Sequence, residues 1–162
     1  MAEESNVVIH RPNREKASSK ATKAVVLLLL LVSIALMVIV VAGGWGTLQG
    51  LKALTVGYIV VYCVIAFFVA RWNRGVLPLA AALAIILAIF AAVAVPAWFD
   101  RDQTGFHQPA IDAGVLGLVC ALLVPVQILL IGFSMRAFNQ AWNVEIERRP
   151  DAPPPRSSPQ PA

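Results

Sequence analysis

The chain has 162 residues, of which 59% are hydrophobic and 14% are charged, and its formal net charge is +4. A mean hydropathy of +0.75 is too high for a soluble globular domain, so the composition indicates an integral membrane protein. The positive charge alone would suggest a nucleic-acid partner, but we expect none, because most basic residues flank apolar segments.

Residues 1–23 are polar and contain no periodic apolar face. They predict a disordered cytoplasmic tail with a short helical approach after Pro12. Residues 11–23 of this tail carry five basic residues: Arg11, Arg14, Lys16, Lys20 and Lys23. Such a cluster beside an apolar segment is typical of the cytoplasmic flank of a membrane span.

The first apolar segment, residues 24–42, contains Ser33 as its only polar side chain. As a helix it would be about 28 Å long, which matches the roughly 30 Å hydrocarbon core of a bilayer. We therefore predict that it spans the membrane. A glycine-rich turn over residues 43–50 leads into a second predicted span over residues 51–70.

The third predicted span, residues 76–99, is rich in alanine. Four of its alanines recur at every fourth position: Ala80, Ala84, Ala88 and Ala92. A stripe of small residues lets another helix backbone approach closely, so we expect this helix in the centre of the bundle.

The fourth predicted span, residues 113–135, contains Pro125 and Gln127. Proline removes a backbone donor and leaves a carbonyl one turn earlier without its partner, which predicts a kink. Residues 136–149 fit both a helical and a strand period, and we expect an amphipathic segment along the cytoplasmic interface. Residues 150–162 are rich in proline and predict a disordered tail.

The distribution of basic residues predicts the orientation. Eleven of the 13 Lys and Arg residues fall in the first tail, the second connection and the C-terminal segments, which share one side of a four-span chain. Lys52 and Arg101 are the two that remain for the other side. The positive-inside rule therefore predicts that both termini are cytoplasmic. The alanine- and valine-rich composition is typical of a high-GC bacterial genome, so we expect the bacterial cytoplasmic membrane.

The sequence offers few groups for catalysis. The two histidines, His10 and His107, fall outside the predicted spans, and no Asp, Glu, Lys, Arg or His lies deep in any span. Cys63 and Cys120 lie in separate apolar segments and form no CxxC motif. We therefore predict a protein that is not an enzyme, with no catalytic residue and no cofactor.

One loop resembles a calcium-binding loop in its first half. Asp100, Asp102, Thr104 and Gly105 have the spacing of ligand positions, but Ile111 stands where such a loop requires a bidentate glutamate. We therefore predict no metal site.

Three polar side chains of different spans lie at a similar depth. Ser33, Tyr62 and Gln127 are each about 12 to 14 Å from the cytoplasmic boundary by the helical rise. A buried amide needs hydrogen-bond partners in hydrocarbon, and Pro125 frees a carbonyl that needs a donor. These four residues predict a polar layer that holds the helices together. A pocket for a lipid or quinone head group is the alternative.

These segments predict an all-α fold, an antiparallel four-helix transmembrane bundle in up-down-up-down order, with one membrane domain at residues 24–135 and an interfacial C-terminal segment. We expect a non-catalytic accessory subunit or a homo-oligomeric bundle. Its partners would be the lipid bilayer and either other membrane subunits or further copies of itself. The alternatives are a transporter or channel for an uncharged or apolar solute and a lipid- or quinone-binding membrane protein.

Overall fold

The computed structural model describes residues 8–48, 50–101 and 109–148 of the chain. The described part is predominantly α-helical, and four of its helices are long and apolar enough to cross a membrane. They are α2 (Ala17–Gly43), α3 (Lys52–Ala70), α4 (Leu77–Phe99) and α5 (Ala113–Asn139). These features are those of a membrane protein built as a helical bundle.

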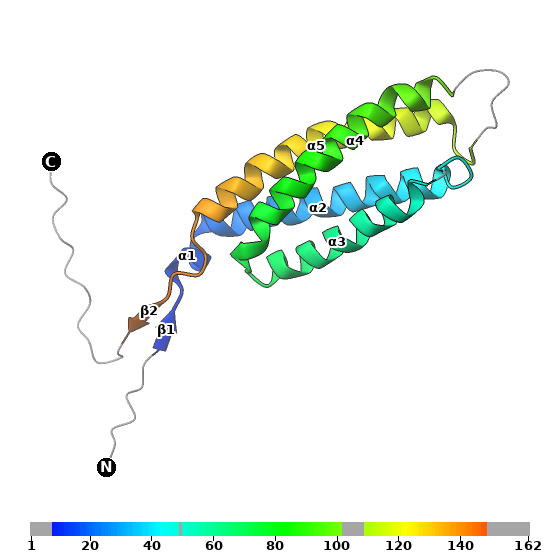
Figure 1. The fold of residues 1–162 in the computed structure, drawn as a ribbon. Coiled ribbons are helices and arrows are strands. Elements are labelled where there is room, and N and C mark those ends of the chain that lie inside the picture. The colour runs from blue at the N-terminus through cyan, green and yellow to red at the C-terminus, as the bar shows by residue number, and fades with distance from the viewer. Residues whose placement is uncertain (1–7, 49, 102–108, 149–162) are drawn as a thin grey trace, which may run out of the picture.

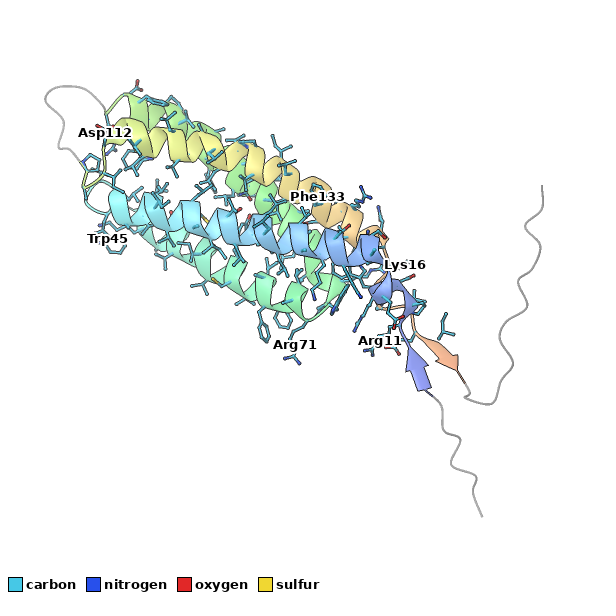
Figure 2. All side chains as sticks on the ribbon, turned by 180° about the vertical axis from the view of Figure 1, so that it is seen from behind. Arg11, Lys16, Trp45, Arg71, Asp112 and Phe133 are labelled. Atoms are coloured by element: carbon cyan, nitrogen blue, oxygen red, sulfur yellow. The ribbon has the colours of Figure 1, made fainter. Side chains whose placement is uncertain are left out.

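The connections between the four long helices alternate between the two ends of the bundle (Figure 1). The short 3-10 helix η1 (Arg74–Val76) joins α3 to α4 at the end where α2 begins. We define this as the terminal end, and we define the end that holds the α2–α3 and α4–α5 connections as the far end. Figure 2 shows Lys16 and Arg71 at the terminal end and Trp45 and Asp112 at the far end.

The helices are not packed equally tightly. α4 and α5 form the closest pair, whereas α3 packs mainly against α2 and only sparsely against α4. The face that α4 buries is rich in alanine and comprises Leu77, Ala80, Ala81, Ala84, Leu87, Ala91 and Trp98. These short side chains let the backbone of a neighbouring helix come close, which accounts for the tight contact between α4 and α5.

Local signals set where two of these helices begin. The Asp112 carboxylate accepts hydrogen bonds from the backbone N–H groups of Gly114 and Val115, at 2.9 and 3.2 Å, and so caps the start of α5. Pro78 lies in the first turn of α4, where its missing N–H costs no intrahelical bond.

The N-terminal segment is more ordered than the sequence predicts. The short helix α1 (Pro12–Glu15) precedes α2, and α2 already begins at Ala17. Ser19 and Thr22 are buried, with 1% and 5% of their surfaces exposed. Because the buried side chains of this part of α2 are small and polar, hydropathy does not detect the packed face. Helix α1 confirms the predicted short helical approach after Pro12, whereas the prediction of a disordered tail is wrong for the rest of residues 8–23. Residues 1–7 lie outside the described range.

Residues 136–149 do not form the single amphipathic segment that the sequence predicts. α5 continues to Asn139, the chain turns, and strand β2 (Ile146–Arg148) pairs antiparallel with strand β1 (Val8–His10). The helical period of this sequence thus belongs to the end of α5, and the strand period belongs to β2. Residues 149–162, with the proline-rich tail, and residues 102–108, with most of the calcium-like loop, lie outside the described residues.

Apolar side chains both fill the bundle and cover its outside. One cluster occupies the middle and the terminal end, and a smaller cluster around Trp98 and Leu116 occupies the far end. Many large apolar side chains also point outward, among them Leu28, Ile89 and Leu118, each about three-fifths exposed. An outer surface of this kind matches a hydrocarbon surround rather than water.

Candidate functional site

A polar layer links three helices inside the bundle. The Tyr62 hydroxyl on α3 donates to Gln127 Oε1 on α5 over 2.9 Å, and Gln127 Nε2 donates to Ser33 Oγ on α2 over 2.8 Å. The Ser33 hydroxyl in turn donates to the carbonyl of Leu29, one turn earlier in α2, over 2.7 Å. The structure thus brings together three of the side chains that the sequence places at one depth, and all three are completely buried.

The polar side chains of this layer form hydrogen bonds with one another and with the backbone of α2. Its hydrogen bonds run in one direction, from Tyr62 through Gln127 to Ser33, so each bond polarises the next. None of the three side-chain types carries a charge at neutral pH. The Ser33 hydroxyl donates to a backbone carbonyl and has no base beside it, so it is not an activated nucleophile. The arrangement can hold three helices in register, but it supplies no acid–base pair.

Pro125 is not a member of the polar layer. It lies on the exposed surface of α5, because two residues along a helix correspond to a rotation of about 200° and Gln127 faces the interior. α5 continues as one helix through Pro125. Among the described residues, the Gln127 amide donates to Ser33 and makes no hydrogen bond to the backbone next to the proline.

Only the first half of the predicted alanine stripe of α4 is completely buried. Ala80 and Ala84 are completely buried, whereas Ala88 is half-buried and Ala92 is exposed. Each four-residue step advances about 40° beyond a full turn, so a strict stripe rotates away from the neighbouring helix. The buried face continues through Leu87 and Ala91 instead.

Trp142 closes the terminal end of the bundle, although the sequence predicts it in the lipid interface. Its completely buried ring meets the Trp72 ring edge to face, with centroids 5.2 Å apart. Trp142 Nε1 donates to Gln140 Oε1 over 3.1 Å, and Gln140 Nε2 donates to Thr22 Oγ1 over 3.0 Å. The polar edge of the indole is therefore satisfied inside protein. Trp72 follows the end of α3, Trp142 follows the end of α5, and both helices end at the terminal end of the bundle. This shared position is the sequence signal that could have predicted their contact.

Basic residues at the terminal end hold this closure in place. Lys23 Nζ donates to the Ala70 carbonyl over 2.7 Å and lies 4.1 Å from the centroid of the Trp72 ring. Arg14 Nε donates to the Trp142 carbonyl over 3.0 Å, and burial lowers the pKa of this guanidinium from its ordinary value. Both cations therefore donate to backbone carbonyls, and Lys23 also makes a cation–π contact with Trp72, so they have a structural role at the end of the bundle.

An apolar pocket of about 390 Å³ lies in the far half of the bundle. Figure 1 shows α3 and α4 meeting near their shared turn and diverging toward the far end, and residues of both helices line the pocket. Met37 of α2, Leu87 of α4 and Leu123 of α5 are among its lining residues, as are Thr55 and Arg101 near the far end. No sequence pattern marks the pocket, because it depends on how two helices diverge.

Other buried groups offer little chemistry. Among the described residues, no cluster of three or more His, Cys, Asp or Glu side chains could hold a metal ion. Cys120 is buried, Cys63 is exposed on α3, and both are free thiols. The buried Ser134 hydroxyl has no hydrogen-bond partner in the described part of the chain, and Ser134 does not line the pocket. Comparison with protein-family models, with curated proteins and with solved structures finds no match to this chain.

Proposed function

We propose that the chain is a non-catalytic membrane protein whose four long helices cross the cytoplasmic membrane of a bacterium. The observation that carries this proposal is the layer of Ser33, Tyr62 and Gln127, which is completely buried, uncharged and hydrogen-bonded within itself. Catalysis requires a polar group that is free to act on a substrate, and the layer uses its groups to join helices.

The order of crossing is up-down-up-down, with both termini in the cytoplasm. The alternating connections support this order (Figure 1), and Figure 2 shows Arg11, Lys16 and Arg71 gathered at the terminal end. Lys52 and Arg101 are the described basic residues at the far end. The positive-inside rule then assigns the terminal end to the cytoplasm.

The protein acts through its helix surfaces, either as an accessory subunit of a membrane complex or as a homo-oligomer. α3 is the least buried of the four long helices, and one of its faces presents Val60, Val64 and Phe67, each about half exposed. These side chains recur at helical spacing, so they form a continuous apolar ridge that another membrane helix can pack against.

Purification in mild detergent, followed by mass spectrometry of co-eluting proteins and of intact complexes, tests this role. The proposal predicts either membrane subunits in fixed stoichiometry or a homo-oligomer, and it predicts that Val64→Trp on the α3 ridge weakens the assembly. Leu118→Trp, on the exposed surface of α5, is the matched control and should leave it intact. A monomer that elutes without partners would contradict this role.

A second candidate function is the binding of an apolar ligand such as a lipid, and the pocket between α3 and α4 favours it. A channel for an uncharged solute is less well supported. A path along the bundle interior would meet the polar layer, where one hydrogen-bonded chain joins α2, α3 and α5.

A further inference from the structure

We propose that the pocket between α3 and α4 binds one acyl chain of an anionic phospholipid, with the lipid phosphate beside Arg101. The proposal rests on the membrane-spanning role, because a bilayer must deliver the lipid. It goes further by assigning the ligand class, the leaflet at the far end and the residue that recognises the head group.

The size and shape of the pocket suit a chain. Its volume of about 390 Å³ falls within the roughly 300–1,000 Å³ of ligand pockets. Along α4 it is lined from Leu87 to Trp98, which corresponds to about 16 Å by the helical rise. That length is greater than half of the roughly 30 Å hydrocarbon core, so a chain from one leaflet fits along it.

The polarity of the lining changes along the pocket as the polarity of a phospholipid does. The deeper residues are apolar, among them Met37, Leu87 and Leu123. Toward the far end the lining includes Thr47 and Thr55, whose hydroxyls donate to backbone carbonyls and can still accept a hydrogen bond. An acyl chain would contact the first group, and the ester and head-group oxygens would lie near the second.

Arg101 supplies the charge at the outer end of the pocket. It lies two residues after the end of α4, it is exposed, and its guanidinium carbon lies 5.8 Å from the centroid of the Trp98 ring, which also lines the pocket. No ion pair joins Arg101 to a carboxylate within residues 8–48, 50–101 and 109–148, although Asp100 is its neighbour in the chain. A guanidinium matches the geometry of a phosphate and can bind it through two parallel hydrogen bonds.

Lys52, the first residue of α3, adds a second cation at the same end of the bundle. Its Nζ lies 4.8 Å from the centroid of the Trp45 ring, so an indole at the interface holds it near head-group depth. The far end also carries the carboxylates of Asp100 and Asp112, and that of Asp112 caps the start of α5. Arg101, which lines the outer end of the pocket, is therefore the group that favours an anionic over a zwitterionic lipid.

Native mass spectrometry of the full chain in mild detergent, with phosphatidylglycerol or phosphatidylcholine added as the probe, tests the proposal. We expect one phosphatidylglycerol to be retained per chain. Ala94→Phe, which fills the pocket, should reduce this retention at least ten-fold, and Ala97→Phe provides a second filled pocket. Ala92→Phe, on the exposed surface of the same helix outside the pocket, is the matched control and should bind as the parent does.

The contribution of the Arg101 charge to lipid preference is tested separately. Arg101→Gln should lower the preference for phosphatidylglycerol over phosphatidylcholine by about five-fold, whereas Arg71→Gln at the terminal end should not change it. Equal retention by the parent, Ala94→Phe and Ala97→Phe would overturn the site even if the chain spans the membrane as proposed. A dimer that Ala94→Phe disrupts would assign the pocket to a second copy of the chain and would also overturn the proposal.

Discussion

Replacing Gln127 with leucine removes the central member of the polar layer. The change breaks the 2.9 Å hydrogen bond from Tyr62 and the 2.8 Å hydrogen bond to Ser33. An interhelical hydrogen bond in a membrane protein contributes about 0.6 kcal/mol on average and at most about 1.7, so two losses amount to about 1 to 3 kcal/mol. The Tyr62 hydroxyl would also remain buried without its acceptor, which places the expected cost in the upper half of this range.

A double-mutant cycle separates the lost bond from the buried group that it leaves behind. Tyr62→Phe alone should cost about 1 kcal/mol, because Gln127 Oε1 loses its donor. In the Gln127→Leu/Tyr62→Phe double variant neither partner of that bond remains. The double variant should therefore be less destabilised than the sum of the single variants, by about 1 kcal/mol.

The free energy of unfolding can be measured by titrating detergent-solubilised protein with sodium dodecyl sulfate and following circular dichroism. Ile128→Leu, at the next position of α5 and 60% exposed, is the control and should change it by less than about 0.5 kcal/mol. Single-variant effects that add to within about 0.3 kcal/mol would refute the coupling between Tyr62 and Gln127. A Gln127→Leu protein as stable as the parent would refute the stabilising role of the layer.

Three further predictions concern packing and metal binding. Ala84→Leu should lower the free energy of unfolding by about 1 to 3 kcal/mol because Ala84 is completely buried, whereas Ala92→Leu on the exposed surface should not, and equal effects would contradict the packing of α4. Trp142→Ala should cost about 3 kcal/mol or more in the same titration, against less than about 0.5 for Trp45→Ala, which is 54% exposed. Calorimetry with millimolar calcium should show no heat above dilution, and a saturable signal that Asp100→Ala abolishes would contradict the absence of a calcium site.

The long apolar helices and the partners of Gln127 could be predicted from the sequence for a simple reason. In a four-span chain the bilayer thickness sets the length of each helix, and the helical rise converts sequence position into depth. Ser33, Tyr62 and Gln127 then lie at one level, and a buried amide at that level needs partners. Depth alone does not say which way a side chain points, and the carbonyl that Pro125 frees does not say so either. The sequence therefore does not reveal that Pro125 lies on the opposite side of α5 from Gln127.

The terminal closure and the pocket could not be predicted in this way. Ser19 and Thr22 are buried although they are polar, and Trp142 is buried although its sequence position matches the lipid interface. Their burial depends on contacts between segments more than one hundred residues apart, such as the hydrogen bond from Gln140 to Thr22. The pocket depends on the divergence of α3 from α4, which no local pattern in either helix records.

The number of membrane crossings and the side of each end are tested most directly by cysteine labelling in a variant that lacks Cys63 and Cys120. Gly46→Cys and Ala110→Cys place thiols at exposed positions of the far end, and a side chain at residue 46 meets no other atom within 4 Å. Both should react with a membrane-impermeant maleimide on intact cells, whereas Ser158→Cys should react only after the membrane is permeabilised. Labelling of Ser158→Cys on intact cells, or protection of both far-end cysteines, would contradict the proposed four-span topology with cytoplasmic termini.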